Sequence, residues 1–253
     1  MKHYKLLLLV PFMLLTGCEM EKEITVEDAK KTIELIQNSV IEDPYMFVLT
    51  NKGDIGKGED KISVDLSYKY KKSSNGYYSY IKGLNGNESY DAEMYCVKDY
   101  TYGEVKYVKY FDASKNDYVK AVATLKDDEN YETAFDNLGV YRTESVLNYY
   151  LGVRMFSEQV DEGDTLKIYS SREGQLTLQY VTNVKNADST EDEIVSKGKS
   201  VYKYEDYRFS AVNVDTSSNY GNKWVTKGAM EYDDKIKVEL PSDWENYIPR
   251  AGE

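Results

Sequence analysis

The sequence predicts a β-dominated α+β domain in which helices cover the concave face of a curved antiparallel sheet of about ten strands. Three observations predict this fold class. From residue 60 onward, apolar and polar residues alternate, as they do in strands that bury one face. Short turns separate successive strands, which is typical of antiparallel neighbours. The chain has 26 Tyr against 6 Phe and 2 Trp, and tyrosine suits half-buried strand positions.

The first 17 residues have the features of a signal peptide. Lys2 and Lys5 precede an apolar stretch over 6–15. This stretch is too short to span a bilayer, which takes about 20 residues. It is followed by Leu-Thr-Gly-Cys, which resembles the lipobox of bacterial lipoproteins. The resemblance implies cleavage between Gly17 and Cys18, a diacylglyceryl thioether on Cys18 and, in many species, an N-linked acyl chain such as palmitate.

Lipidation at Cys18 would determine where the protein resides. Each buried methylene contributes about 0.8 kcal/mol, so two or three acyl chains would anchor the chain stably. We therefore expect the lipid on Cys18 to attach the protein to the cell membrane, on its extracytoplasmic face in the cell envelope. The alternative is an ordinary secretory signal with a coincidental cysteine.

Cleavage also limits the chemistry of the mature chain, because it removes His3, the only histidine. Catalysis by Ser-His-Asp or Cys-His groups and His-ligated zinc or copper sites are thereby excluded. Cys96 is then the only free thiol, and its position in an alternating run predicts a small buried residue. No intramolecular disulfide is expected.

After the signal peptide, 1–17, and a lipidated cysteine with its tether, 18–24, we expect one domain over 25–250. It begins with an amphipathic helix, with Thr25 as its N-cap and Asp43-Pro44 as its end. Apolar residues recur at spacings of three and four, which predicts packing against the sheet. These residues are Val26, Ala29, Ile33, Ile36 and Val40.

Five strands are predicted in the first half of the domain. Asn75-Gly76 and Asn85-Gly86 are typical hairpin turns between them. The strands comprise 62–70, the return strand with Tyr78 and Tyr80, 92–97, 105–110 and 118–125.

A helical period follows over 133–158, with Thr143 as an N-cap and a shorter helix before Gly139. Strands are then expected at 166–169, 176–182, 201–214, 224–232 and 236–240. The polar residues 185–199 are expected to form a loop.

Together, the lipobox, the first helix, a meander, central helices, a second meander and a final strand ending at Leu240-Pro241 resemble the LolA/LolB-type half-barrel. The same fold occurs in LppX/LprG-type lipoproteins. The resemblance covers about residues 25–248 and lies in the order of elements rather than in a motif. It implies a half-barrel whose cavity, between sheet and helices, holds acyl chains or lipidated proteins.

The first functional interpretation is a membrane-anchored, non-catalytic binding module for a lipid or other apolar ligand. The alternative for the same residues is that the apolar faces fill each other as a core. The residues expected to line the cavity are Ile33, Ile36, Val64, Leu66, Tyr68, Leu147, Tyr150 and Leu151.

The second interpretation is a surface adhesion or assembly protein that binds a protein or a cell-wall glycan through Tyr-rich outer strands. Its candidate residues are Tyr77-Tyr78, Tyr149-Tyr150 and the group Tyr202, Tyr204 and Tyr207. The alternative explanation for these tyrosines is the preference of tyrosine for strands.

Charge and residue content argue against other classes of function. With 32 Lys and Arg against 44 Asp and Glu, the net charge of −12 argues against a nucleic-acid partner. The acidic runs 127–129 and 191–193 are typical of solvated loops, so we expect neither an enzyme nor a cofactor nor a metal site. Weak cation binding near 188–193 remains open as an alternative.

Overall fold

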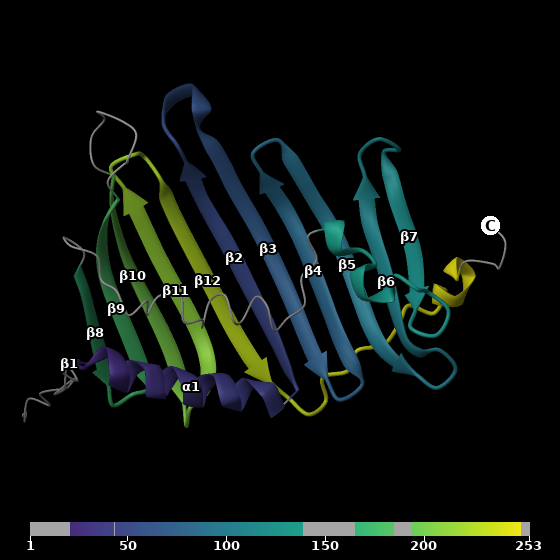
Figure 1. The fold of residues 1–253 in the computed structure, drawn as a ribbon, viewed down its shortest axis with the longest axis horizontal. Coiled ribbons are helices and arrows are strands. Elements are labelled where there is room, and N and C mark those ends of the chain that lie inside the picture. The colour runs from purple at the N-terminus through teal and green to yellow at the C-terminus, as the bar shows by residue number, and fades with distance from the viewer. Residues whose placement is uncertain (1–20, 43, 139–164, 185–193, 249–253) are drawn as a thin grey trace, which may run out of the picture.

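The computed structural model describes residues 21–42, 44–138, 165–184 and 194–248. In this part of the chain, twelve strands form one open antiparallel sheet, and a single α-helix lies across one face of it (Figure 1). The predicted fold class, a β-dominated antiparallel sheet with helical cover, is confirmed. The strands are β1 (Lys22–Glu23), β2 (Tyr45–Ile55), β3 (Ile62–Ser73), β4 (Gly76–Asn85), β5 (Glu88–Asp99), β6 (Gly103–Asp112), β7 (Asp117–Thr124), β8 (Thr165–Ser171), β9 (Gln175–Val184), β10 (Ile194–Glu205), β11 (Arg208–Ser218) and β12 (Lys223–Tyr232).

Two meanders, β2 to β7 and β8 to β12, make up this sheet. They meet in its middle, where β12 pairs with β2 in the register Ala229↔Val48. Consequently β7 forms one edge, while β8 lies near the other and pairs with the short β1. Every strand pair is antiparallel, so the sheet needs only hairpins within each meander.

The helix α1 (Val26–Glu42) begins and ends as the sequence predicts. The Thr25 hydroxyl accepts a hydrogen bond from the Asp28 backbone N–H at 3.1 Å, which satisfies one free donor of the first turn. The helix buries Ala29, Ile33 and Ile36 against the sheet. No helix in the described ranges is long and apolar enough to cross a membrane.

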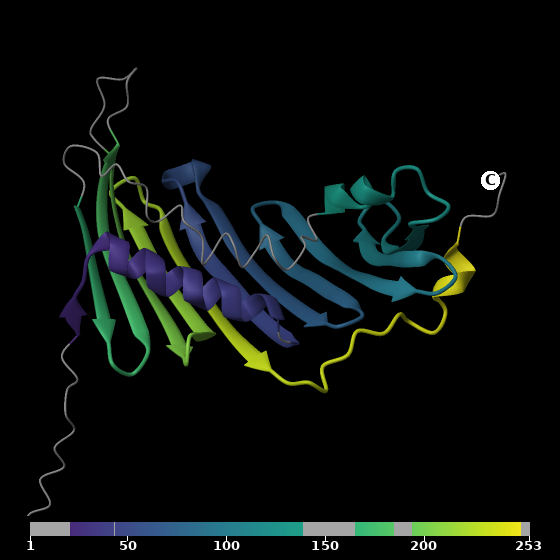
Figure 2. The same ribbon diagram turned by 60° about the horizontal axis from the view of Figure 1, so that its bottom comes forward.

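We call the sheet face that carries α1 the inner face and the opposite face the outer face. Two apolar clusters lie on the inner face, one under α1 and one nearer β7. The second is covered in part by Phe135 and Leu138, in and beside the 3-10 turns η2 (Tyr131–Thr133) and η3 (Asp136–Leu138). A third cluster lies on the outer face, where residues 240–248 pack on β6 and β7. Figure 2 shows the C-terminal segment on the side of the sheet away from α1.

Several predicted boundaries were wrong. Tyr45–Ile55 forms the central strand β2, which no predicted strand included, and Lys22–Glu23 of the expected tether pairs with β8. Residues 194–199 belong to β10 rather than to a loop. The predicted strand 201–214 is divided by a turn, because Asp206 and Tyr207 adopt φ values of 48° and 61°. Such a turn is usually marked by Asn or Gly, which is why the sequence did not reveal it.

The predicted strand 236–240 and the predicted helices of 133–158 also need correction. Residues 236–240 pair with no strand and instead cross the outer face. Before Gly139, the structure contains 3-10 turns in place of a short helix. The rest of the 133–158 prediction lies outside the described residues.

Candidate functional site

The residues predicted to line an apolar cavity lie on the inner face but not in one group. Ile33 and Ile36 are at most 4% exposed and pack into the cluster under α1. Val64 and Leu66 belong to the second inner cluster, and Tyr68 packs against both clusters. The remaining candidates, Leu147, Tyr150 and Leu151, lie outside the described residues, as do Gly17 and Cys18. Beneath α1, Ile33 and Ile36 fill the space between helix and sheet. That the predicted residues line a cavity stays a prediction.

The predicted tyrosine groups do not form one outer patch. Tyr77 and Tyr78 are successive strand residues and lie on opposite faces, with Tyr77 against the second inner cluster. Tyr202 is buried in the cluster under α1, while Tyr204 and Tyr207 stack on each other with centroids 6.1 Å apart. Tyr149 and Tyr150 lie outside the described residues. Of these, Tyr78 contributes to the site described next.

A pocket of about 430 Å³ lies on the outer face, between the sheet and the segment 237–239. We call it the outer pocket. Strands β3, β4 and β5 form its floor, so its groups stand on a rigid support. Its lining residues are Lys69, Lys71, Tyr78, Tyr95, Lys237, Val238 and Glu239.

The segment that completes the outer pocket is held from both sides. Val238 is 2% exposed, and its carbonyl accepts a hydrogen bond from the Asn75 side-chain amide at 2.9 Å. Further along, the Asp243 carboxylate accepts a hydrogen bond from Lys120 at 2.7 Å. The Trp244 ring then meets the Tyr102 ring edge-on at 5.8 Å. These contacts fix residues 237–244 on the outer face in an extended path.

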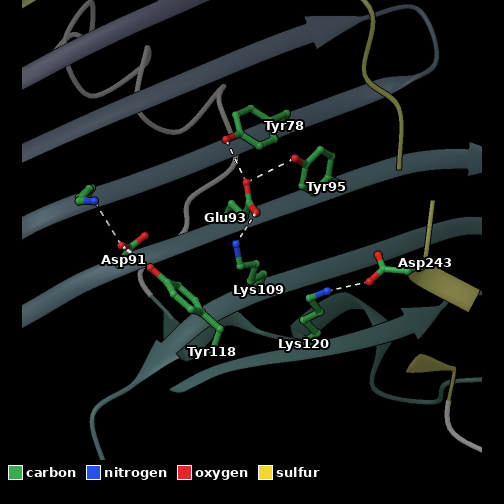
Figure 3. A network of polar contacts seen from close by, with 9 residues as sticks. Tyr78, Asp91, Glu93, Tyr95, Lys109, Tyr118, Lys120 and Asp243 are labelled. Atoms are coloured by element: carbon green, nitrogen blue, oxygen red, sulfur yellow. Dashed lines mark hydrogen bonds and ion pairs between the residues drawn. The ribbon is translucent and has the colours of Figure 1, made fainter. Parts of the chain in front are cut away.

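Tyr78 and Tyr95 form the aromatic wall of the outer pocket. Their ring centroids are 4.7 Å apart, with the planes tilted by 57°. Both hydroxyls donate to the same Glu93 oxygen, each at 3.3 Å, and Lys109 pairs with the other oxygen at 3.7 Å (Figure 3). Burial, followed by the negative charge of Glu93, raises the pKa of Tyr95 to about 12 and also raises the pKa of Tyr78. The phenols are therefore neutral near pH 7, with their hydroxyls engaged by Glu93.

The lysines of the outer pocket differ from four nearby lysines of the outer face that pair with carboxylates. Neighbouring lysines pair with carboxylates at 2.7 to 3.7 Å, and these are Lys52, Lys82, Lys109 and Lys120. In contrast, Lys69, Lys71 and Lys237 have no carboxylate within 4.0 Å in the part of the chain that the structure describes. The Lys71 ammonium lies 5.7 Å from the centroid of the Tyr78 ring. Glu239 is the carboxylate that lines the pocket, so the three lysines leave an excess of positive charge there.

The sequence pointed to this site only in part. The alternation in β3 assigned Lys69 to the polar face, and the tyrosine content drew attention to Tyr78. The contribution of Lys237 was missed, because 236–240 has the period of a strand. Nothing in a single sequence places this segment across β3 and β4.

A second polar cluster lies on the inner face, around Cys96 of β5. The thiol is 1% exposed and donates to Glu104 at 2.9 Å, which confirms the predicted burial. Burial raises its pKa to about 11, and Glu104 adds to the shift. The Lys106 ammonium nearby donates to the backbone carbonyls of Tyr131 and Glu132 and holds the η2 turn on the sheet. In the described ranges, no group of three His, Cys, Asp or Glu side chains is arranged to hold a metal ion.

Comparison with known proteins leaves the family open. No protein-family model and no curated protein matches the chain. Among solved structures, a LolA superfamily protein from Nitrosomonas europaea matches over 85% of this chain and 96% of its own. The sequence identity is 9% and the TM-score is 0.28. This is the superfamily that the order of elements resembles, but the TM-score is too low to assign the chain to it.

Proposed function

We propose that the chain is a lipid-anchored, extracytoplasmic binding protein without catalytic activity, and that it holds its ligand in the outer pocket. The observation that carries this proposal is the pocket itself. Its volume lies in the usual range for small-ligand sites, roughly 300–1,000 Å³. It combines aromatic walls with charged groups on a rigid sheet, a combination that suits recognition.

The proposed location and lipid anchor rest on the signal-like N-terminus and on the Leu-Thr-Gly-Cys run that ends at Cys18. Glu21, three residues later, accepts hydrogen bonds from Gln175 at 2.7 Å and from Thr177 at 3.2 Å, close to the β8–β9 hairpin. Three residues span at most about 11 Å, so an acylated Cys18 would hold this corner of the sheet near the membrane.

The anchor is tested with the full-length precursor expressed in a bacterial host. We expect wild-type protein to incorporate labelled palmitate and to sediment with membranes, whereas Cys18→Ala does neither. Ala113→Cys, combined with Cys18→Ala, adds an exposed cysteine in the β6–β7 turn and controls for nonspecific labelling. Equal labelling or equal sedimentation of wild type and Cys18→Ala would refute the anchor.

Binding in the outer pocket is tested by acetylating surface lysines of residues 19–253, with Cys18 replaced by Ala, in the presence of soluble saccharides and short peptides. A ligand in the pocket protects Lys69, Lys71 and Lys237 from acetylation. Lys52 and Lys227 stand outside the pocket and serve as internal controls. Uniform acetylation with every probe would argue against a binding role for the outer pocket.

A second candidate is an apolar ligand on the inner face, as the sequence resemblance implies. The observation in its favour is a group of aromatic residues that pack on the second inner cluster and are only partly buried, namely Tyr68, Tyr90 and Trp224. Native mass spectrometry of the same protein, purified without detergent, tests this function. A stoichiometric lipid adduct supports it. A bare mass after incubation with a lipid extract argues against it.

A further inference from the structure

We infer that the outer pocket selects an anionic saccharide, with a sugar ring against Tyr78 and Tyr95 and its carboxylate or phosphate between the lysines. This inference deepens the proposed function of the same pocket and rests on it. It specifies the charge of the ligand and the shape of the ligand face that contacts the pocket. The volume of the pocket determines neither property.

The charge of the ligand follows from the unpaired lysines. The chain as a whole has a net charge of −12, so most of its surface repels anions. Three other lysines of the outer face, Lys52, Lys82 and Lys120, pair with carboxylates at 2.7 to 3.5 Å. The lysines of the outer pocket are not paired with carboxylates in this way in the described residues, and all three line the same pocket. Like charges held near one another are stabilised by an anion placed between them.

The carboxylate of Glu93 lies close to the outer pocket, but its oxygens are engaged by other groups. Glu93 lies next to the aromatic wall, but two phenol hydroxyls and Lys109 engage its oxygens. Its charge is thus already compensated by Lys109 and by the two hydroxyls. The remaining carboxylate, Glu239, lines the pocket together with three lysines. An anionic ligand therefore meets more ammonium groups than carboxylates.

The shape of the ligand follows from the tyrosine pair. Because the hydroxyls are engaged by Glu93, Tyr78 and Tyr95 offer mainly their rings to a ligand. Aromatic faces carry negative charge density and attract the slightly positive C–H groups of a pyranose ring. The rings are tilted by 57°, so they form an angled wall rather than a parallel slot for a flat aromatic base. An acyl chain is disfavoured because lysines line the same space.

The inference is tested with residues 19–253 carrying Cys18→Ala, by isothermal titration calorimetry with three probes. Trigalacturonic acid supplies sugar rings with carboxylates, maltotriose has the same number of rings without charge, and phenyl phosphate has a charge and a flat ring but no sugar. We expect trigalacturonic acid to bind about tenfold more tightly than maltotriose at low salt, since a hydrogen bond to a charged group contributes about 1.5–3 kcal/mol. Its affinity falls as sodium chloride is raised from 20 to 300 mM, and that of maltotriose does not.

Matched variants locate the effect. Lys71→Gln and Lys69→Gln each weaken trigalacturonic acid binding about tenfold, as expected when one charge-assisted contact is lost. Lys52→Gln and Lys82→Gln alter the same face outside the pocket and leave the affinity unchanged. Circular dichroism and thermal unfolding confirm that each variant is folded.

Three outcomes overturn the inference. If maltotriose binds as tightly as trigalacturonic acid and Lys71→Gln has no effect, selection for an anion is wrong while the binding function stands. If phenyl phosphate, which has no sugar, binds most tightly, the saccharide assignment is wrong. If none of the three probes binds to the folded protein, the saccharide inference fails, and lysine acetylation with peptide probes decides separately whether the pocket binds at all.

Discussion

Lys120 on β7 donates a hydrogen bond to Asp243 at 2.7 Å, across 123 residues of sequence. This ion pair, drawn in Figure 3, fastens the C-terminal segment to the outer face. It lies beyond residues 237–239, which line the outer pocket. The contact lowers the pKa of Asp243 and raises the pKa of Lys120, so both groups are charged at neutral pH. The Lys120 ammonium also lies 5.1 Å from the Tyr247 ring. A single side chain thus holds both an acid and an aromatic ring of this segment.

Replacing Lys120 with Met is expected to loosen the segment without unfolding the sheet. Hydrogen exchange measured by mass spectrometry should become faster in residues 237–248, while the melting temperature shifts by less than about 2 °C. Lys115→Met is the control, because Lys115 pairs with Asp112 at 3.4 Å inside the β6–β7 turn. Equal exchange in the two variants would show that the ion pair does not hold the segment.

The attachment of the C-terminal segment through Lys120 and Asp243 is expected to depend on pH. Because the pKa of Asp243 lies below its ordinary value of 3.8 in the folded protein, its contribution is present above that value. It is lost as the pH falls through the lowered pKa. Hydrogen exchange in residues 237–248 of the wild-type protein should therefore become as fast as in Lys120→Met only well below pH 4. Convergence of the two proteins already at pH 5 would contradict the lowered pKa.

Tyr78 and Tyr95 should ionise only in strong base. The ultraviolet titration of Glu93→Gln is expected to show tyrosines ionising at lower pH than in wild type, because the charge of Glu93 helps to hold the pKa of Tyr95 at about 12. A raised folded-state pKa favours the folded protein below pH 10. That contribution is lost between pH 10 and about 12, as the unfolded chain ionises first. Identical titrations of wild type and Glu93→Gln would exclude Glu93 as a cause.

Cys96 is expected to be unreactive in the folded protein. With a pKa of about 11, roughly one thiol in a thousand is ionised at pH 8, and burial also blocks access. We expect iodoacetamide to label Cys96 in guanidinium chloride but not in native buffer. The Ala113→Cys variant supplies an exposed thiol as a positive control. Native labelling of Cys96 at the rate of that control would show that β5 opens readily.

The helix α1 offers a direct test of the inner core. Ile36 is fully buried under the helix, whereas Leu35 beside it is 47% exposed. Ile36→Ala should lower the free energy of unfolding by about 3 kcal/mol, because it leaves a cavity against the sheet. Leu35→Ala should change it by less than about 1 kcal/mol. Urea denaturation measures both, and similar losses would mean that α1 does not pack as the structure shows.

The regular parts of the fold could be predicted from the sequence. Strand β3 has apolar residues on its inner face alone, and Thr25 caps α1, so both elements were evident from period and capping. Strand β2 was missed because Met46 and Val48 on its outer face are as apolar as Phe47 and Leu49 on its inner face. A central strand that is apolar on both faces lacks the alternation on which the prediction depended.

The candidate site could be predicted less well. Residues 236–240 alternate because Val238 turns toward the sheet while Lys237 and Glu239 are exposed. This is the pattern of a segment lying on a sheet as well as of a strand within it. The pairing of lysines with carboxylates likewise depends on strand register, and one sequence does not supply that register. Lys69 and Lys52 are therefore alike in sequence but differ in the structure.

The pairing of β2 with β12 has a consequence for folding during synthesis. Thr50 and the Lys227 carbonyl, joined at 3.4 Å, are 177 residues apart, so the centre of the sheet closes only after nearly the whole chain has emerged. Until then, β2 is an open edge with Phe47 and Leu49 unsheltered, although it later becomes one of the best protected strands. Folding is thus in competition with aggregation at this edge until β12, the last long strand of the described residues, has been synthesised and pairs with β2.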